Sequence, residues 1–159
     1  MGYLEKISSV KEELGREIRS PLLFVLAAEF LQVLVNRAAS SNLLVPPLPQ
    51  PNEDFPIVQY ADDILLIMQA DARQLLFLKA LLASFAESTG LKVNYSKSQM
   101  LAINVSQEKI EHLANTFGCS TGFFPFTYLG LPMGTTKPKM EDLTPLMDRV
   151  ERCLSGSAT

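Results

Sequence analysis

The hydrophobic and polar positions of this chain form patterns that divide it into helix-like and strand-like segments. In residues 1–19, apolar side chains recur every three or four positions among charged ones, which predicts a short amphipathic or frayed helix. Residues 22–35 are apolar on almost every side, and Ser20-Pro21 before them suits a helix start, because serine caps and proline fits the first turn. A helix that is apolar all round is typically buried, so we expect this one in the core.

A proline-rich segment separates this helix from a predicted hairpin. Residues 40–56 contain Pro46, Pro47, Pro49, Pro51 and Pro56. Proline lacks the amide hydrogen that helix and ladder bonds need, so the segment is predicted to be an irregular connector. Two β-rich apolar runs follow, 57–60 and 64–68, and the short stretch Ala61-Asp62-Asp63 joins them. Two such runs around a short turn predict a β-hairpin.

The pattern after the hairpin predicts a helix and then two short strands. Asp71 is the expected N-cap, Gln74 three residues later completes a capping-box sequence, and Gly90 suits the C-terminal cap. Residues 91–95 and 100–104 are the strand candidates.

The last third of the chain predicts two further helices with a short β element between them. Residues 106–118 have the pattern of a capped helix, 126–133 that of a strand or tight hairpin, and a last helix is expected from about Asp142. The complete order of elements predicts an α+β fold, in which helices pack on a small antiparallel sheet.

Composition and charge limit the possible functions. The chain has 159 residues, 47% of them hydrophobic and 19% charged, which is typical of one packed domain rather than of a disordered chain. Its net charge of −3 is unusual for a nucleic-acid binder, because neutralising phosphates normally requires a basic face. Either the chain does not grip nucleic acid, or the basic parts belong to sequence outside it.

Cysteine and histidine usage argues against a zinc site, and the apolar segments suggest no membrane partner. Cys119 and Cys153 are far apart and His112 is the only histidine, so we expect two reduced thiols in an intracellular protein. The apolar stretch 21–35 is shorter than the ~20 residues of a membrane span. No targeting segment is evident, which favours the cytoplasm or the nucleus.

The pair Asp62 and Asp63 at the hairpin tip is the strongest candidate for chemistry. Nucleotidyl transfer uses two Mg²⁺ ions, which take hard oxygen ligands such as adjacent carboxylates on a rigid turn. The alternative is that both aspartates are solvated turn residues, which is common. The turn lacks the Gly or Asn that hairpins prefer, which favours a role beyond turn formation.

Four sequence blocks resemble reverse transcriptases, most closely the LINE-type (non-LTR) retrotransposon enzymes abundant in plant genomes. The hairpin tip is similar to their YxDD box, and the other blocks occur in the family's order and spacing around it. The four blocks are Ser20-Pro21-Leu22-Leu23-Phe24-Val25-Leu26, Tyr60-Ala61-Asp62-Asp63, Thr89-Gly90-Leu91-Lys92-Val93-Asn94-Tyr95-Ser96-Lys97-Ser98 and Phe126-Thr127-Tyr128-Leu129-Gly130-Leu131-Pro132-Met133-Gly134. The resemblance implies a partial palm that contains the YADD hairpin.

The resemblance also implies roles for single residues around a Mg²⁺ centre. Asp62 would be the main metal ligand, Asp63 would support it, and Lys97 would neutralise or protonate the leaving pyrophosphate. Residues 59–60 would flank the primer strand, and residues 128–130 would lie near its end. The residues so placed are Gln59, Tyr60, Tyr128, Leu129 and Gly130. On the sequence alone, a solvated loop lysine is the favoured interpretation of Lys97, and residues 128–130 are equally well an ordinary packed strand. The implied partners are an RNA template and a DNA primer.

The chain departs from the family pattern before residue 20. The family holds its metals with a further aspartate from an earlier strand, but the chain has only Asp54 before Asp62, and no strand is expected before the apolar helix. Only Ser20-Pro21 remains of the family's Q-G-D-P-L-S-P block. We therefore expect an unrelated segment at 1–19, a partial palm reaching the start of the thumb at 20–154, and a tail at 155–159.

These departures leave four hypotheses open. The favoured one is a retrotransposon reverse-transcriptase fragment that is inactive alone, with weak or absent template and primer binding. The second is a polymerase that another chain completes, the third a non-enzymatic interaction module, and the fourth a chain without a stable fold.

Overall fold

In a computed structural model of the chain, residues 2–8, 10–12, 21–48 and 54–134 are described, together with positions 139, 144, 147, 148 and 152. For 2–8, 10–12 and 21 the description covers the backbone. The chain forms two compact units, Met1–Thr121 and Gly122–Thr159.

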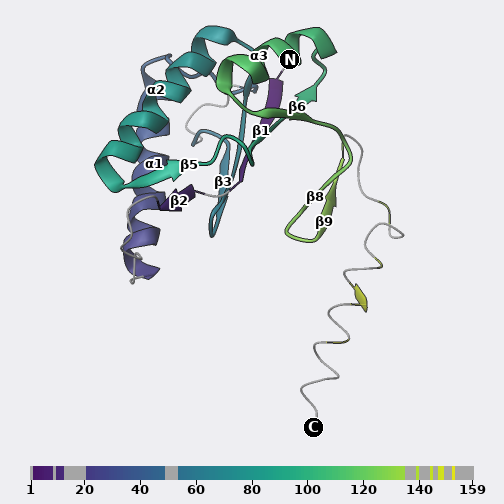
Figure 1. The fold of residues 1–159 in the computed structure, drawn as a ribbon, viewed down its shortest axis with the longest axis horizontal. Helices are drawn as coiled ribbons and strands as arrows, with labels where there is room; N and C mark the ends of the chain where they lie inside the picture. Colours follow the sequence, from purple (N-terminus) through teal and green to yellow (C-terminus); the bar gives the residue numbers. More distant parts are fainter. Residues whose placement is uncertain are drawn as a thin grey trace. The chain divides into compact units, whose positions relative to one another are not determined.

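The first unit is built on a five-stranded sheet (Figure 1), whose strands are β1 (Gly2–Ser8), β3 (Ile57–Tyr60), β4 (Asp63–Gln69), β6 (Gln99–Ile103) and β7 (Ser120–Gly122). Their order in the sheet is β3-β4-β1-β6-β7. Its pairs β3·β4, β4·β1 and β1·β6 are antiparallel, which confirms the α+β prediction. A separate ladder joins β2 (Val10–Glu12) to β5 (Leu91–Val93).

The N-terminal segment corrects two sequence-based predictions. Residues 2–8 and 10–12 are strands rather than a helix, and a strand does precede the apolar helix. β1 lies between β4 and β6, and its register places Ser8 opposite Asp63. A short isolated helix is marginal in water, whereas a central strand satisfies its backbone groups on both edges. The ladders on either side therefore outweigh the helical spacing of the apolar residues.

Three helices cover one face of this sheet: α1 (Pro21–Ser40), α2 (Ala72–Thr89) and α3 (Gln107–Phe117). Ile64, Leu66 and Met68 alternate along β4 and are buried in the same core cluster as side chains of all three helices. Figure 1 shows α1 and α2 side by side along the strands. Because sides alternate along a strand, Asp63 and Leu65 belong to the opposite face.

Helix α1 is longer and more exposed than its sequence predicts. Leu31, Val35 and Ala38 are buried, but large apolar side chains along the rest of the helix are exposed, so the expectation of a fully buried helix is wrong. Leu22–Ser40 is also long and apolar enough to cross a membrane, judged by length and composition alone. The exposed large side chains are Leu22, Leu23, Val25, Leu26, Phe30 and Val33.

The polar residues of α1 attach it to the segment that precedes β3. Asn36 accepts from the Phe55 amide at 3.0 Å and donates to Asp54 Oδ1 at 2.7 Å. Gln32 donates to the Phe55 carbonyl at 3.5 Å, and the Phe55 side chain is itself buried. These bonds, together with the buried side of the helix, make α1 part of a protein core rather than an isolated apolar segment.

The caps of α2 and α3 follow the sequence with two exceptions. Asp71 accepts hydrogen bonds from the amides of Arg73 and Gln74, as an N-cap does. The Gln74 side chain does not complete a capping box, because its Oε1 accepts instead from the Val45 amide at 2.7 Å. Gly90 and Gly118 both close their helices in the left-handed conformation. Ser106 precedes α3 but makes no side-chain capping bond.

The second unit contains the predicted tight hairpin, formed by β8 (Phe126–Tyr128) and β9 (Leu131–Met133). Phe124 and Phe126 form an edge-to-face pair with ring centroids 5.5 Å apart. The helix predicted from about Asp142 lies outside the described residues, apart from single helical positions at 144, 147, 148 and 152.

Candidate active site

The hairpin of β3 and β4 ends in a two-residue turn. Tyr60 and Asp63 form the last pair of the ladder, and Ala61 and Asp62 make the turn between them. Ala61 has a φ of 47°, whereas Asp62 has no positive φ. Two-residue turns with a positive φ at their first position alone normally have glycine there, so alanine is strained by about 1 kcal/mol. Such strain is often found at functional sites.

The side of the hairpin that faces away from the helices carries Tyr60 and Asp63. Asp63 alternates with Ile64, whose side chain is buried in the helix-covered core. Tyr60 is paired with Asp63, and paired residues share a face of the sheet. The Tyr60 ring is 59% exposed, Asp62 is exposed and Asp63 is half-buried. The hairpin therefore presents the Asp63 carboxylate and the Tyr60 ring on the side of the sheet that the helices leave uncovered, and Asp62 is exposed at the turn beside them.

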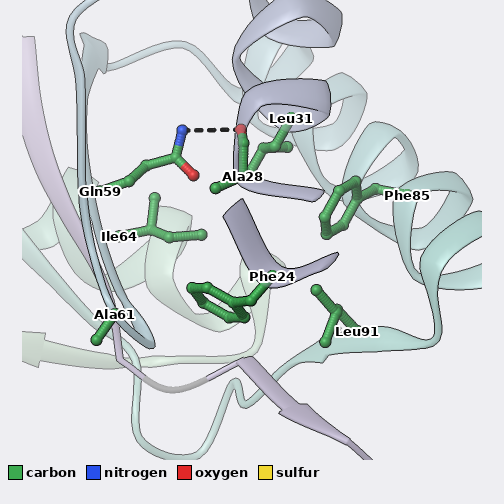
Figure 2. A pocket seen from close by; sticks show the side chains of 8 residues that line it. All are labelled: Phe24, Ala28, Leu31, Gln59, Ala61, Ile64, Phe85 and Leu91. Atoms are coloured by element: carbon green, nitrogen blue, oxygen red, sulfur yellow. Dashed lines mark hydrogen bonds between the residues drawn. The ribbon is translucent and has the colours of Figure 1, made fainter. Parts of the chain in front are cut away.

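Gln59 braces the hairpin from the opposite side. Its Nε2 donates to the Ala28 carbonyl of α1 at 3.1 Å, as the dashed line in Figure 2 shows. The side chain is half-buried and lies on the helix face, where Gln59 is paired with Ile64. The predicted contact of Gln59 with the primer strand stays a prediction. In the structure, the hydrogen bond from Gln59 to Ala28 fixes the tip of the hairpin relative to α1.

A small apolar pocket that is partly open to solvent adjoins the turn on the helix side. Figure 2 shows Gln59 and Ala61 on one side of it, and Phe85 and Leu91 on the other. Neither Asp62 nor Asp63 lines this pocket. The expectation that both carboxylates face a cleft therefore stays a prediction. Its complete lining is Phe24, Ala28, Leu31, Gln59, Ala61, Ile64, Phe85 and Leu91.

The fit of a divalent metal depends on how many carboxylates reach the tip. Among the side chains that the structure describes, no group of three or more His, Cys, Asp or Glu residues could hold a metal ion. Asp54 is the only aspartate that precedes Asp62 in the sequence, and its carboxylate accepts a hydrogen bond from Asn36. Asn36 is eight residues beyond Ala28 on α1, about 12 Å along the helix axis. Asp62 and Asp63 therefore suit one water-rich Mg²⁺ ion, which one or two carboxylates can hold, but fall short of a complete two-metal site.

Lys97 lies on a tight turn that hydrogen bonds hold rigid. The amides of Lys97 and Ser98 both donate to the Asn94 carbonyl at 3.1 Å, and Ser98 Oγ donates to the same oxygen at 2.9 Å. Ser98 is fully buried, and its carbonyl accepts from the amide and hydroxyl of Ser120 at the start of β7. The Lys97 side chain is exposed. The structure thus gives the predicted lysine a fixed backbone and a solvated side chain, and its role towards pyrophosphate stays a prediction.

The hairpin of β8 and β9 has a strained tip of its own. Leu129 and Gly130 both have positive φ, 53° and 83°, which is the pattern of a type I′ turn. Leucine is unfavourable in that conformation, and here its side chain is 46% exposed. Tyr128, by contrast, is buried. These three predicted primer-end residues belong to the second unit.

Two features of the site escaped the sequence. The absence of Gly from the first hairpin was visible, but the positive φ of Ala61 was not. The sequence contained no signal for the position of Ser8 opposite Asp63, and its pattern predicted a helix for that segment.

Comparison with known proteins identifies one family. The family model described as reverse transcriptase (RNA-dependent DNA polymerase) matches residues 18–134, which include both hairpins and the turn of Lys97. A search of curated proteins found no significant match.

Proposed function

This chain belongs to the reverse transcriptase (RNA-dependent DNA polymerase) family, and from that premise we propose that it is part of the palm of a LINE-type, plant-like retrotransposon enzyme. The four ordered sequence blocks support the retrotransposon origin, and the match over 18–134 covers all four of them. The cytoplasm or the nucleus is the compartment that we propose.

The carboxylates at the YADD hairpin are the proposed metal ligands. Mg²⁺ use is implied by the family, and Mg²⁺ lowers the barrier to nucleotidyl transfer by stabilising negative charge on the attacking and leaving oxygens. Asp62 is the main ligand in this proposal and Asp63 the supporting one. Their adjacent positions support that assignment, with Asp62 in the two-residue turn and Asp63 at the first residue of β4, in a hairpin that Gln59 bonds to α1.

We further propose that the chain does not extend a primer alone. The observation that carries this proposal is the tip itself, where the described side chains supply two neighbouring carboxylates and no third. Two Mg²⁺ ions at nearby positions need more protein ligands than this pair offers. Another chain that supplies the missing carboxylate would complete the site.

The remaining site residues are assigned by the same family premise. Lys97 acts on the leaving pyrophosphate. Its hydrogen-bonded turn and its exposed side chain support this role, because they hold the backbone in place and leave the ammonium group accessible. Tyr60 and the Leu129 tip contact the primer, which their exposure supports. Gln59 holds the hairpin, and Tyr128 and Gly130 shape the second tip. The partners are an RNA template and a DNA primer, bound weakly, and no membrane.

A primer-extension assay tests this proposal directly. The purified chain is incubated with poly(rA)/oligo(dT), deoxythymidine triphosphate and Mg²⁺ or Mn²⁺. We expect that the primer is not extended. Extension that disappears in Asp62→Ala but survives in Asp54→Asn would show a working site and contradict the proposed inactivity. Asp54 is the matched control because it is an exposed aspartate bonded to Asn36.

A non-enzymatic interaction module is the second candidate function. The specific observation in its favour is the exposed apolar side of α1, since exposed apolar patches of this kind mark interaction surfaces.

A further inference from the structure

The outward side of α1 carries a line of large apolar residues that are at least 40% exposed, although the Phe30 ring also stacks on the buried Phe85 of α2 at a centroid distance of 6.2 Å. We name Leu23, Leu26, Phe30 and Val33 the α1 stripe. Their exposed fractions run from 40% for Phe30 to 56% for Leu23. Their spacing of three, four and three residues is that of the a and d positions of a coiled coil, so they share one side of the helix.

The α1 stripe is symmetric about the level of Ala28. Leu23 and Val33 each lie five residues from that position, and Leu26 and Phe30 each lie two residues from it. If two copies of α1 pack antiparallel and cross there, position 23 of one copy faces position 33 of the other, and position 26 faces position 30. Each apolar side chain then meets an apolar side chain, as a two-fold interface requires.

We propose that the α1 stripe binds a second copy of this chain, with the two α1 helices antiparallel and related by a two-fold axis near the level of Ala28. The spacing corresponds to the shallow crossing of about 20° found in antiparallel bundles. The stripe itself contains no charged residue, so the contact is apolar.

The area available sets the strength of this contact. Leu22, at 66% exposed, extends the stripe at its N-terminal end. Five half-exposed side chains offer on the order of 500 Å² in each copy, or about 1,000 Å² for the pair, which is at the lower limit of specific interfaces. The dimer is therefore weak, with a dissociation constant of about 10–100 µM.

Sedimentation equilibrium of the full chain from about 5 to 500 µM tests the proposal. The native chain is expected to pass from monomer to dimer over this range, and to do so equally at about 0.5 M salt because the contact is apolar. Leu23→Glu is expected to raise the dissociation constant at least about tenfold, by placing a charge in the interface. Leu76→Glu is the matched control, since Leu76 is an exposed leucine on α2, 54% exposed, and should leave dimerisation unchanged.

A mixing experiment tests the antiparallel register. Val33→Lys alone should weaken the dimer as Leu23→Glu does, but the two variants mixed should form a heterodimer, because Glu at position 23 then faces Lys at position 33. Far-UV circular dichroism and thermal unfolding confirm that each variant folds. A chain that stays monomeric at every concentration, or a mixture that fails to associate, would overturn the proposal.

A lipid surface is the competing occupant, because α1 has the length and hydropathy of a membrane helix. Flotation with phosphatidylcholine vesicles distinguishes the two. The native chain is expected to stay unbound; vesicle binding that Leu23→Glu abolishes, together with a monomeric chain in solution, would replace the second copy by a membrane.

Discussion

The backbone at the tips of the two hairpins is strained at a single residue each. Ala61 and Leu129 both occupy the left-handed region at the first position of a two-residue turn, where glycine is favoured. Each follows a tyrosine that ends its strand, Tyr60 or Tyr128. Strained backbone of this kind is often found at functional sites.

Relief of that strain should be measurable at Ala61. Ala61→Gly is expected to raise the free energy of unfolding by about 0.5–1 kcal/mol, because glycine adopts a positive φ without the steric cost of a Cβ atom. Urea denaturation followed by circular dichroism measures the change. Ala72→Gly, at the exposed first residue of α2, is the control and should destabilise instead. Equal effects of both variants would contradict a strained turn.

At the scale of elements, strand β1 lies beside the proposed metal ligands but places a serine, not a third carboxylate, opposite Asp63. Its register places Ser8 opposite Asp63, on the strand next to the one that carries the aspartate. Residues directly opposite each other across a ladder have Cβ atoms about 5 Å apart. A carboxylate at position 8 would therefore lie within reach of a cation held by Asp62 and Asp63.

Ser8→Asp should consequently strengthen divalent metal binding. We expect the affinity for Mn²⁺, measured by electron paramagnetic resonance of the free ion, to increase about tenfold or more over the native chain. Lys6→Asp is the matched control, because position 6 is paired with Leu65, two residues or about 7 Å further along the strand. An increase in Lys6→Asp as large as in Ser8→Asp would show a general effect of added charge rather than a third ligand.

Capping distinguishes two helices whose sequences look alike at their starts. Asp71→Ala is expected to lower the free energy of unfolding by about 1 kcal/mol, because its carboxylate accepts from two amides of α2. Ser106→Ala should cost much less, since Ser106 makes no side-chain capping bond to α3. Thermal unfolding of both variants gives the comparison. A loss at Ser106 that matched the loss at Asp71 would mean that the caps differ less than their hydrogen bonds indicate.

Elements with strong local signals were predicted well. The hairpin at 57–69, the bounds of α2 and α3, and the second hairpin were all visible, because turns and caps depend on residues within a few positions of each other. The Gln74 side chain was misplaced because its partner, Val45, is distant in sequence. The same reason explains why β7 and the strands of the N-terminal segment were not predicted.

At the scale of the whole molecule, net charge governs how the chain meets nucleic acid. The sequence has 14 basic and 17 acidic side chains. The acidic side chains repel phosphates, so the basic ones can neutralise few of them. We expect a fluorescently labelled primer–template to bind with a dissociation constant above about 10 µM in fluorescence anisotropy, and to lose less than tenfold in affinity between about 50 and 200 mM salt. Tight binding with a steep salt dependence would reveal a basic surface that the net charge conceals.

Whether α1 is buried was also a question for the whole molecule. Its sequence is apolar nearly all round, but the core receives one side only, through Leu31, Val35 and Ala38. How much of a helix is covered depends on the elements packed against it, and a one-dimensional pattern does not contain them. The exposed α1 stripe is the consequence.

The sequence alone determined the elements with local signals, the YADD tip, and the family to which the chain belongs, because turn chemistry, caps and motif spacing are properties of neighbouring residues. Tertiary structure decided the rest. It set β1 between β4 and β6, tied Gln59 to α1, and left one side of α1 uncovered. Each of these depends on pairing and packing between distant segments, where the free energy of many weak contacts outweighs local preference.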